Sequence, residues 1–503
     1  MSIDRDDTDL AELGYRPSLD RSVGRFGSFA AGVSYISILT GTFQLFYFGF
    51  GSGGPAYWWS WPMVFAGQLM VALCFAELAG RYPIAGSIYN WSKRLGSATT
   101  SWLAGWTMLI ASIVTLSAVV LAYQLTLPQV WSGFQVVGDG SGTYDFAVNA
   151  VLLGSVLVLF TTVVNAYGVK LMSRINSFGV VLELVAAVLL VVLLAVNIRR
   201  GPSVLTETAM TGEGRDLGYV GAFLVAALAS GYVMYGFDTA SSLGEETKNP
   251  RRTAPRAILT ALLASFVLGG LILLFAILAA PDLGDERLGM SSGGLQLIVL
   301  QALGSNLGKA FLVCVVVAIT VCALAVHAAT IRIVFAMARD NNLPGGSVLA
   351  RVHPTRRTPV VPAVAIGVLA VLILVVNIRQ PQIFTVVTSI AIILIYLAYL
   401  MVTGPMLLAR LRGEWEPGES FSLGRWGLPV NIAAVVWGTV FAINLGWPRQ
   451  EVYDAVEPRH WYLQYGAPLA VGTVLLGGLA LYRLRQRHRT GVLPEHAVQV
   501  QVP

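Results

Sequence analysis

The sequence predicts an all-α integral membrane protein with about twelve transmembrane helices, and three observations support this fold class. Of the 503 residues, 55% are hydrophobic and only 12% are charged, whereas charged residues make up about 25% of an ordinary soluble domain. Apolar stretches of about twenty residues, the length of a membrane-spanning helix, recur from Phe29 to Leu484. Lys and Arg residues are concentrated in alternate loops. This combination excludes a soluble multidomain protein.

The apolar stretches define the individual spans. A sliding window of about twenty residues separates six spans in the first half of the chain and six in the second. The spans are predicted near residues 29–50, 59–79, 100–123, 146–164, 177–196 and 220–243, and then near 257–280, 310–338, 360–378, 383–408, 428–446 and 461–482.

The distribution of basic residues predicts the orientation of these spans. If the N-terminal tail is cytosolic, the inner segments hold 25 of the 33 Lys and Arg residues, and the outer loops hold the other eight. Because basic residues are enriched in cytosolic loops, we expect a multi-pass protein of the plasma or inner membrane with both termini cytosolic. The basic residues are spread over several loops, so nucleic-acid binding is not expected.

The ends of the chain differ from the spans. The first twenty residues contain six acidic residues, where a signal peptide would carry a basic region followed by an apolar one. Residues 1–27 are therefore expected to form a disordered cytosolic tail, and residues 485–503 a second cytosolic tail. No metal site or bound cofactor is expected, because the cysteines lie in apolar runs without the spacing of metal ligands. They are Cys74, Cys314 and Cys322.

Landmarks in the two halves of the chain keep a similar offset, which suggests an internal repeat. Each unit would contain five spans, and because five is odd, the second unit would start from the opposite side of the membrane. Such inverted repeats are typical of secondary transporters, although regular helix spacing can also arise by chance. The offsets are 195 residues from Gly41 to Gly236, 201 from Ala79 to Ala280 and 210 from Thr100 to Ala310.

The repeat predicts the organisation of the whole chain. A shorter, mildly amphipathic segment follows the second span of each unit, at Ala85–Leu95 on the inside and at Gly294–Leu303 on the outside, as inversion requires. The two last spans would be additions to the ten-helix core. The predicted units are residues 28–197 for the first repeat, 218–410 for the second, and 427–484 for helices 11 and 12.

The first span contains Thr40, Gly41 and Thr42 at its midpoint, where a continuous helix favours neither glycine nor β-branched residues. A break at Gly41 would leave backbone N–H groups at the start of a half-helix, and such groups bind a carboxylate without a basic side chain. The alternative is a close contact between helices, in which small residues are common. The spacing alone leaves both interpretations open.

The sixth span carries Tyr235, Gly236, Phe237 and Asp238. A charge within a span costs roughly 2.5–3.5 kcal/mol on insertion scales, so it normally faces a cavity or a partner. If the span breaks at Gly236, Asp238 could meet a substrate ammonium, a cation or a proton. If the helix is continuous, Asp238 lies toward the inner surface and pairs with a nearby basic residue. The glycine at the matching place in the first span favours the break.

Two further titratable residues lie within spans. Glu183 is nine residues from Arg174 and sixteen from Arg199, which places it about 13 Å inside the core at 1.5 Å per residue. A carboxylate at that depth is by default a proton or cation site, or one member of a buried pair. His327 lies in the eighth span and is either a proton relay or a donor in a structural interhelical hydrogen bond.

Three motifs resemble those of the amino acid-polyamine-organocation superfamily of permeases. Residues 76–91 (AELAGRYPIAGSIYNW) resemble the segment after its second span. Residues 236–258, with GFD, EETKNPRR and PRAI, are similar to the sixth-span signature of its amino acid and choline transporter branch. Residues 338–344 (ARDNNLP) resemble the loop after its eighth span. Together the motifs cover most of residues 28–410.

The resemblance implies a fold of five plus five inverted helices, with substrate held between the broken first and sixth spans. It further implies that the backbone of Thr40, Gly41 and Thr42 receives a substrate carboxylate, although many members have Gly-Ser-Gly at this place. Tyr235, Gly236 and Phe237 would supply carbonyl groups and a gating aromatic ring. In several proton-coupled relatives a lysine on the fifth span replaces a sodium ion, and here Glu183 stands at that place.

The sequence therefore predicts a secondary active transporter that moves an amino acid or related amine by alternating access. Coupling to protons through Glu183 is expected, with Asp238 second and His327 as a further candidate, and sodium is the alternative ion. The expected partners are a small-molecule substrate and the lipid bilayer. The alternatives are a transporter of choline, polyamine or another organic cation, and a nutrient receptor that does not transport. An enzyme is not expected, because no nucleophile elbow or HExxH motif accompanies His327.

Overall fold

The computed structural model describes residues 5–140, 142, 144–213, 215, 217–376, 378, 383–453 and 459–498. These residues form helices and two isolated β-bridges. Within this part of the chain, ten helices are long and apolar enough to cross a membrane. Two shorter apolar helices, Gly218–Gly231 and Val360–Val376, lie where the sixth and ninth spans were predicted. The predicted all-α membrane fold is confirmed.

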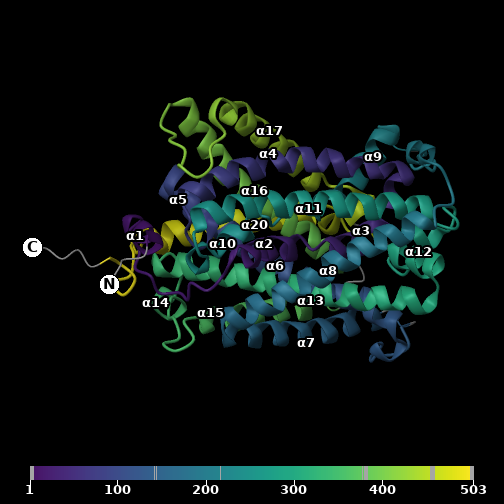
Figure 1. Ribbon diagram of the computed structural model, residues 1–503, viewed down its shortest axis with the longest axis horizontal. Coiled ribbons are helices and arrows are strands. Elements are labelled where there is room, and N and C mark those ends of the chain that lie inside the picture. Colours follow the sequence, from purple (N-terminus) through teal and green to yellow (C-terminus); the bar gives the residue numbers. More distant parts are fainter. Residues whose placement is uncertain are drawn as a thin grey trace, which may run out of the picture.

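The long helices run side by side along the length of the bundle (Figure 1). The third-span helix, α6, packs against both α13 and α16 near the centre of the bundle, and α4 packs against α11. The long helices are α4 (Ser60–Arg81), α6 (Ala98–Val130), α7 (Asp145–Tyr167), α8 (Val169–Val196), α11 (Pro250–Ala279), α13 (Ser305–Arg339), α16 (Ile383–Leu411), α17 (Gly427–Gly446) and α20 (Gly466–Leu481). The shorter helix α15 (Val360–Val376) lies among them.

The outer helices expose apolar side chains as a lipid-facing surface does. On α8, Phe178, Val185 and Val192 lie seven residues apart, on one face of the helix, and are 71%, 59% and 51% exposed. Soluble monomers rarely carry such contiguous apolar patches. In a bilayer the same face contacts hydrocarbon, so the exposure agrees with the membrane-spanning assignment.

The first span is broken, but not at the predicted residue. Helix α2 (Arg25–Ile36) ends and helix α3 (Ile38–Gly53) begins at Ser37, which has a φ of 43°. Gly41 lies inside α3, where its N–H donates to the Ser37 carbonyl at 2.9 Å. A Cβ atom at Gly41 would lie 2.5 Å from Val233 Cγ1. The predicted break at Gly41 is therefore wrong, because this glycine allows close helix contact instead.

The sixth span breaks as predicted at Gly236. Helix α9 (Gly218–Gly231) ends before this residue, and the chain becomes helical again at α10 (Thr239–Ser242). Gly236 has a φ of 83°, and a Cβ atom there would lie 1.9 Å from Tyr35 Cδ1. Only glycine satisfies both the left-handed backbone and the close approach of this ring.

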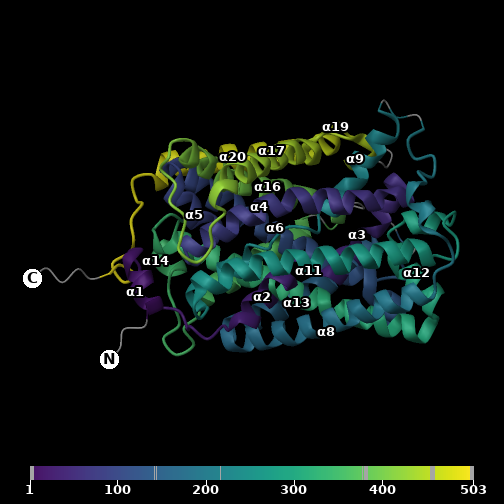
Figure 2. The same cartoon turned by 45° about the horizontal axis from the view of Figure 1, so that its top comes forward.

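The two short segments that were predicted to follow the second and seventh spans are helices. They are α5 (Ser87–Leu95) and α12 (Gly294–Leu303), and they lie at opposite ends of the bundle (Figures 1 and 2). This placement agrees with an inverted repeat. The remaining short α-helices are α1 (Arg5–Glu12), α14 (Gly346–Leu349), α18 (Gln450–Tyr453) and α19 (Trp461–Gln464).

The two tails pack together at one end of the bundle, called here the terminal end (Figure 1). Tyr15 forms an isolated bridge with Ala497, and its side chain is only 1% exposed. The Leu493 N–H donates to the Arg339 carbonyl at 2.8 Å. Disorder was expected for residues 1–27, but their described part contains helix α1 and this buried tyrosine. The difference arises because Tyr15 has a tertiary partner that no local pattern reveals, while residues 1–4 lie outside the described residues.

Docking of the C-terminal tail is expected to depend on pH through His496. Burial, aided by nearby Arg339, lowers the pKa of this imidazole from its ordinary value, and His496 Nε2 lies 3.1 Å from the Ala350 carbonyl oxygen. Because the folded pKa is depressed, docking is strongest above the ordinary pKa of about 6.5 and weakens as the pH falls below it. Glu245 and Glu495 are the other charged groups that act on this ring.

Hydrogen exchange of the amides around Leu493, corrected for intrinsic pH effects, measures this docking. We expect faster exchange near pH 5.5 than near pH 7.5, and His496→Gln should flatten the difference. His488→Gln is the control, because that histidine is exposed in the same tail. An unchanged pH response in His496→Gln would show that another group controls docking.

Candidate functional site

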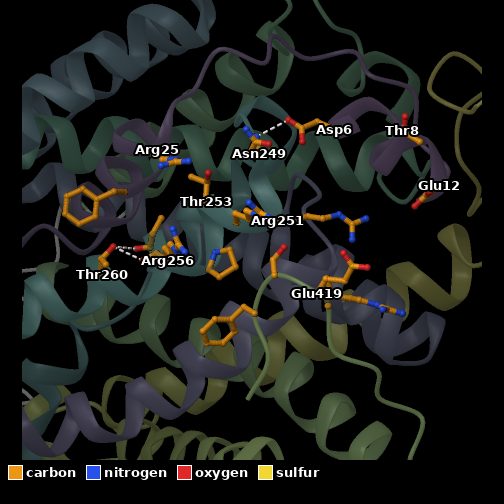
Figure 3. Close-up of a pocket in the computed structure, with 18 residues that line it drawn as sticks. Asp6, Thr8, Glu12, Arg25, Asn249, Arg251, Thr253, Arg256, Thr260 and Glu419 are labelled. Atoms are coloured by element: carbon orange, nitrogen blue, oxygen red, sulfur yellow. Dashed lines mark hydrogen bonds between the residues drawn. The ribbon is translucent and has the colours of Figure 1, made fainter. Parts of the chain in front are cut away.

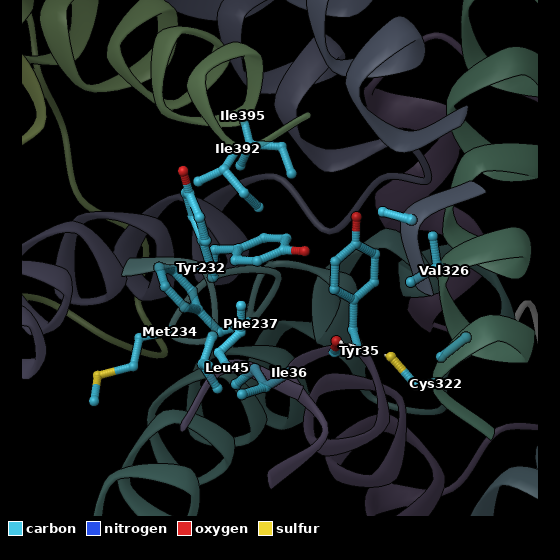
Figure 4. Close-up of a cluster of buried hydrophobic side chains, with 14 of the residues drawn as sticks. Tyr35, Ile36, Leu45, Tyr232, Met234, Phe237, Cys322, Val326, Ile392 and Ile395 are labelled. Carbon is cyan, nitrogen blue, oxygen red and sulfur yellow. Dashed lines mark hydrogen bonds between the residues drawn. The ribbon is translucent and has the colours of Figure 1, made fainter. Parts of the chain in front are cut away.

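The two helix breaks face each other in the middle of the bundle. The Tyr35 ring covers Gly236 and contacts the Tyr235 ring edge to face, with centroids 5.9 Å apart. Figure 4 shows Tyr35 between the residues of the sixth-span break and helix α13, where Cys322 lies. The fold therefore places the predicted residues Tyr235, Gly236 and Phe237 next to the first span. The contact is made by the residues that directly precede the first-span break.

Glu183 of helix α8 lies at the break of the first span. Its Oε1 accepts a hydrogen bond from the Leu39 N–H at 3.0 Å and another from Ser37 Oγ at 3.0 Å. The Ser37 hydroxyl is also 2.6 Å from Thr40 Oγ1. A helix N-terminus favours a negative charge, so the carboxylate caps half-helix α3. Sequence reasoning found Glu183 from its depth but did not find Ser37.

No charged partner of the Glu183 side chain is found in the described part of the chain. The side chain is 1% exposed, and no basic side chain lies within ion-pair distance of it among the described residues. Its second oxygen, Oε2, has no hydrogen-bond partner in the described part of the chain. A buried carboxylate without a cation is costly when ionised, whereas the neutral acid carries its proton at little cost. The arrangement therefore suits a group that exchanges a proton or a cation.

The residues predicted to bind a substrate carboxylate have partners inside the helix. The Thr42 hydroxyl donates to the Ile38 carbonyl at 2.7 Å, and the Gly41 N–H is used within α3. The N-terminal end of the half-helix lies at residues 37–39, three or four residues before the predicted position. The backbone N–H groups of the first span that could bind a carboxylate are thus those that follow Ser37. The Glu183 carboxylate already binds there.

Asp238 is 1% exposed and is held by protein donors on both carboxylate oxygens. The Tyr399 hydroxyl of α16 donates to Oδ1, and Ser87 Oγ of α5 donates to Oδ2 at 3.2 Å. The same Tyr399 hydroxyl accepts from the Gly236 N–H at 2.9 Å. Tyr399 therefore ties the unwound backbone of the sixth span to Asp238. Neither Tyr399 nor Ser87 carries a sequence signal that points to this role.

We expect Tyr399→Phe to destabilise the sixth-span break. The substitution leaves the Gly236 N–H and one Asp238 oxygen without a partner, and each unsatisfied buried group costs about 1–3 kcal/mol. Thermal unfolding and initial rates of substrate uptake should both show the loss. Tyr396→Phe is the matched control on the same helix, because the buried Tyr396 hydroxyl makes no hydrogen bond of good geometry to another described residue. Equal effects in the two variants would contradict the role of Tyr399.

Helix α6 adds polar groups beside the two breaks. Ser112 is a neighbour of the Tyr35 hydroxyl, and Thr115 is a neighbour of the Tyr235 hydroxyl. The hydroxyls of Ser112, Thr115 and Tyr35 are buried, and within the described part of the chain none of them has a partner in good hydrogen-bond geometry. Groups of this kind could bind the polar part of a small solute. They were not predicted, because hydroxyl residues are frequent in membrane helices and only the fold shows which ones face the breaks.

His327 has structural partners on both ring nitrogens. Nε2 is 2.9 Å from the Ala363 carbonyl oxygen of α15, and Nδ1 is 3.0 Å from Thr161 Oγ1 of α7. Since the carbonyl only accepts, Nε2 carries a proton. These contacts link α13 to two neighbouring helices and correspond to the structural interpretation of this histidine. Among the described residues, the His327 side chain makes no hydrogen bond to Glu183 or Asp238.

Buried ion pairs close the terminal end below the two breaks. Glu245 pairs with Arg339 at 2.7 Å, and Glu246 pairs with Arg332 at 2.9 Å. The guanidinium of Arg339 also stacks on the Tyr15 ring, 3.7 Å from its centroid. Because breaking a buried pair leaves an uncompensated charge, this layer can hold the terminal end shut.

Comparison with known proteins agrees with this architecture. A family model described as amino acid permease matches residues 23–476. The amino-acid permease BAT1 of Arabidopsis thaliana is 27% identical over 95% of this chain and 94% of its own length. The branched-chain amino acid permease BcaP of Bacillus subtilis is 28% identical over 72% of this chain and 76% of its own. The crystal structure of MhsT in complex with L-phenylalanine superposes with a TM-score of 0.57 at 16% identity, covering 91% of this chain and 99% of MhsT.

Proposed function

This chain belongs to the amino acid permease family, and on that premise we propose that it is a secondary active transporter, coupled to protons through Glu183. It moves an amino acid across the membrane by alternating access, without altering it chemically. The observation that carries the proposal is the buried carboxylate of Glu183, which caps half-helix α3 at the first-span break and has no cation partner among the described residues.

The hydrogen bonds of Glu183 connect its protonation to the position of the first span. The ionised carboxylate holds the N-terminus of α3 through the Leu39 N–H and Ser37. Protonation at Oε2, which has no partner, removes the charge that favours this contact with the helix N-terminus. A proton therefore loosens the hold of α8 on α3, and the first span can shift relative to the rest of the bundle.

Substrate is proposed to bind between the two breaks, beside Tyr35, Tyr235 and the α6 hydroxyls of Ser112 and Thr115. This position is enclosed at the terminal end by the Glu245–Arg339 and Glu246–Arg332 pairs. Opening toward that end requires these pairs to separate, while the substrate site itself stays near the midplane. The positive-inside bias supports an orientation in which the terminal end faces the cytosol.

An amino acid is favoured over an organic cation as the substrate. Asp238, the residue that could neutralise an amine, already accepts hydrogen bonds from Tyr399 and Ser87. An amine would have to displace one of these donors. The relatives BAT1 and BcaP are named as amino acid permeases, which supports the same choice.

Uptake of radiolabelled amino acids into proteoliposomes tests this proposal. We expect accumulation with an inward proton gradient, in the absence of sodium, and its loss when a protonophore collapses the gradient. Accumulation driven only by a sodium gradient would show that sodium, and not the proton, is the coupling ion. Exchange without any gradient-driven accumulation would contradict ion coupling, and binding without flux would identify a receptor. Competition by amines that lack a carboxylate would favour an organic cation as the substrate.

A further inference from the structure

A cavity of about 1350 Å³ lies at the terminal end, apart from the helix breaks (Figure 3). It is bounded by the tail helix α1, the first turns of α2 and α11, and the loop after α16. Five arginines and three acidic residues line it, so the cavity has a net positive charge. The arginines are Arg25, Arg81, Arg251, Arg252 and Arg256, and the acidic residues are Asp6, Glu12 and Glu419.

The acidic residues of α1 lie apart from two of the arginines in this cavity. Figure 3 shows Asp6 and Glu12 of α1 on one side, with Arg25 and Arg256 on the other side next to Thr260. Asp6 Oδ2 already accepts from the Asn249 N–H at 2.9 Å. The exposed guanidinium groups of Arg25 and Arg256 have no ion-pair partner among the described residues. The positive side of the cavity is thus available to an anion.

Three of the five arginines lie where a positive charge does not stabilise the helix that carries it. Helix α2 begins at Arg25, and Arg251 and Arg252 lie in the first turn of α11. A positive charge at a helix N-terminus opposes the helix dipole. The positive-inside rule accounts for the sign of these charges, but it does not require them to line one cavity. An anion placed there would be stabilised by the arginines and by two helix N-termini together.

The lining of the cavity on helix α11 ends at Thr260, and an exposed apolar surface of the same helix follows it. Arg252, Arg256, Thr260, Leu263 and Val267 recur at three- and four-residue intervals and therefore lie on one face of the helix. Leu263 and Val267 are 51% and 43% exposed. Along this face the exposed residues change from basic to apolar, in the same order as the phosphate and acyl chains of a phospholipid. A free phosphate would make no use of the apolar part.

We propose that this cavity binds the phosphate group of an anionic phospholipid, with Arg25 and Arg256 as ligands and an acyl chain along Leu263 and Val267. Arginine suits this role because its planar guanidinium donates two parallel hydrogen bonds to phosphate oxygens. The proposal rests on the orientation given under the proposed function, in which the terminal end lies at the inner leaflet, where anionic lipids attract basic groups. The lipid would bridge α2, the first half of the broken first span, to α11.

Native mass spectrometry of the full chain measures lipid binding directly, whether or not the protein transports an amino acid. The probes are dioleoylphosphatidylglycerol, dioleoylphosphatidylcholine and inorganic phosphate. We expect wild-type protein to prefer phosphatidylglycerol to phosphatidylcholine, and the double variant Arg25→Gln/Arg256→Gln to bind phosphatidylglycerol roughly 30-fold more weakly, from the attraction of two basic groups to an anionic lipid. Inorganic phosphate should compete weakly.

The matched control is Arg351→Gln/Arg357→Gln, which removes the same charge from the exposed loop between α13 and α15. It should bind phosphatidylglycerol as wild-type protein does. Equal losses in both double variants would overturn the proposal in favour of general attraction to basic loops. Unchanged affinity in Arg25→Gln/Arg256→Gln would overturn it as well. Strong binding of inorganic phosphate that abolishes lipid binding would assign the site to a soluble anion instead.

Discussion

Replacing Glu183 with glutamine is expected to abolish proton-driven accumulation of the substrate while sparing exchange. Glutamine keeps an oxygen that can accept from the Leu39 N–H and Ser37 Oγ, the donors that now bind Glu183 Oε1, but it cannot take up a proton. A gradient of about one pH unit can support about tenfold accumulation with one proton per substrate, since 1.4 kcal/mol corresponds to a factor of ten. The variant should reach equal concentrations on the two sides of the membrane.

The measurement for Glu183→Gln compares accumulation with counterflow in the same proteoliposomes. Glu286→Gln is the control, because Glu286 is exposed on the loop between α11 and α12, and this variant should accumulate substrate normally. Retention of full proton-driven accumulation by Glu183→Gln would move coupling to another group. Loss of both accumulation and counterflow would show that Glu183 acts mainly in positioning α3.

Gly236→Ala is expected to eliminate transport and to lower stability. At this φ of 83°, a residue other than glycine costs about 1–2 kcal/mol. The added methyl group would also lie 1.9 Å from Tyr35 Cδ1, and overpacking of a core costs typically 1–3 kcal/mol. Tyr35 is 3% exposed and has little room to move. Uptake rates and thermal unfolding of the purified variant measure the two effects.

Gly404→Ala is the matched control for this substitution. Gly404 lies within α16, and a Cβ atom there meets nothing within 4 Å. In a helix interior, alanine is more favourable than glycine by about 1 kcal/mol, so the control should be at least as stable as wild type and should transport normally. Wild-type transport by Gly236→Ala would contradict the assignment of Gly236 to the break between the two half-helices.

The sequence located the break of the sixth span correctly and that of the first span incorrectly, for a physical reason. Both predictions used glycine as the marker. At Gly236 the glycine is required by its own backbone, which has a positive φ. At Gly41 it is required by a neighbour, Val233, and the positive φ belongs to Ser37. Glycine alone does not reveal which of these two causes applies.

The depth of Glu183 in the membrane could be predicted from its distance along the chain to the flanking arginines. The hydrogen-bond partners of Glu183 could not be predicted in this way. Ser37 is 146 residues away from Glu183, and no periodicity connects the two positions. Asp238 shows the same limit, since Tyr399 lies 161 residues further along the chain.

The sequence by itself determined that this protein is a helical membrane protein. It also placed a carboxylate in the middle of the fifth span and a helix break in the sixth span. These properties depend on hydrophobicity, charge and backbone freedom, which each residue carries wherever it lies. Only the tertiary structure decided that Glu183 caps α3, that Asp238 binds Tyr399, and that the tails pack over Arg339. Hydrogen bonds and ion pairs act over about 3 Å, so their partners are known only once distant segments of the chain have been brought together.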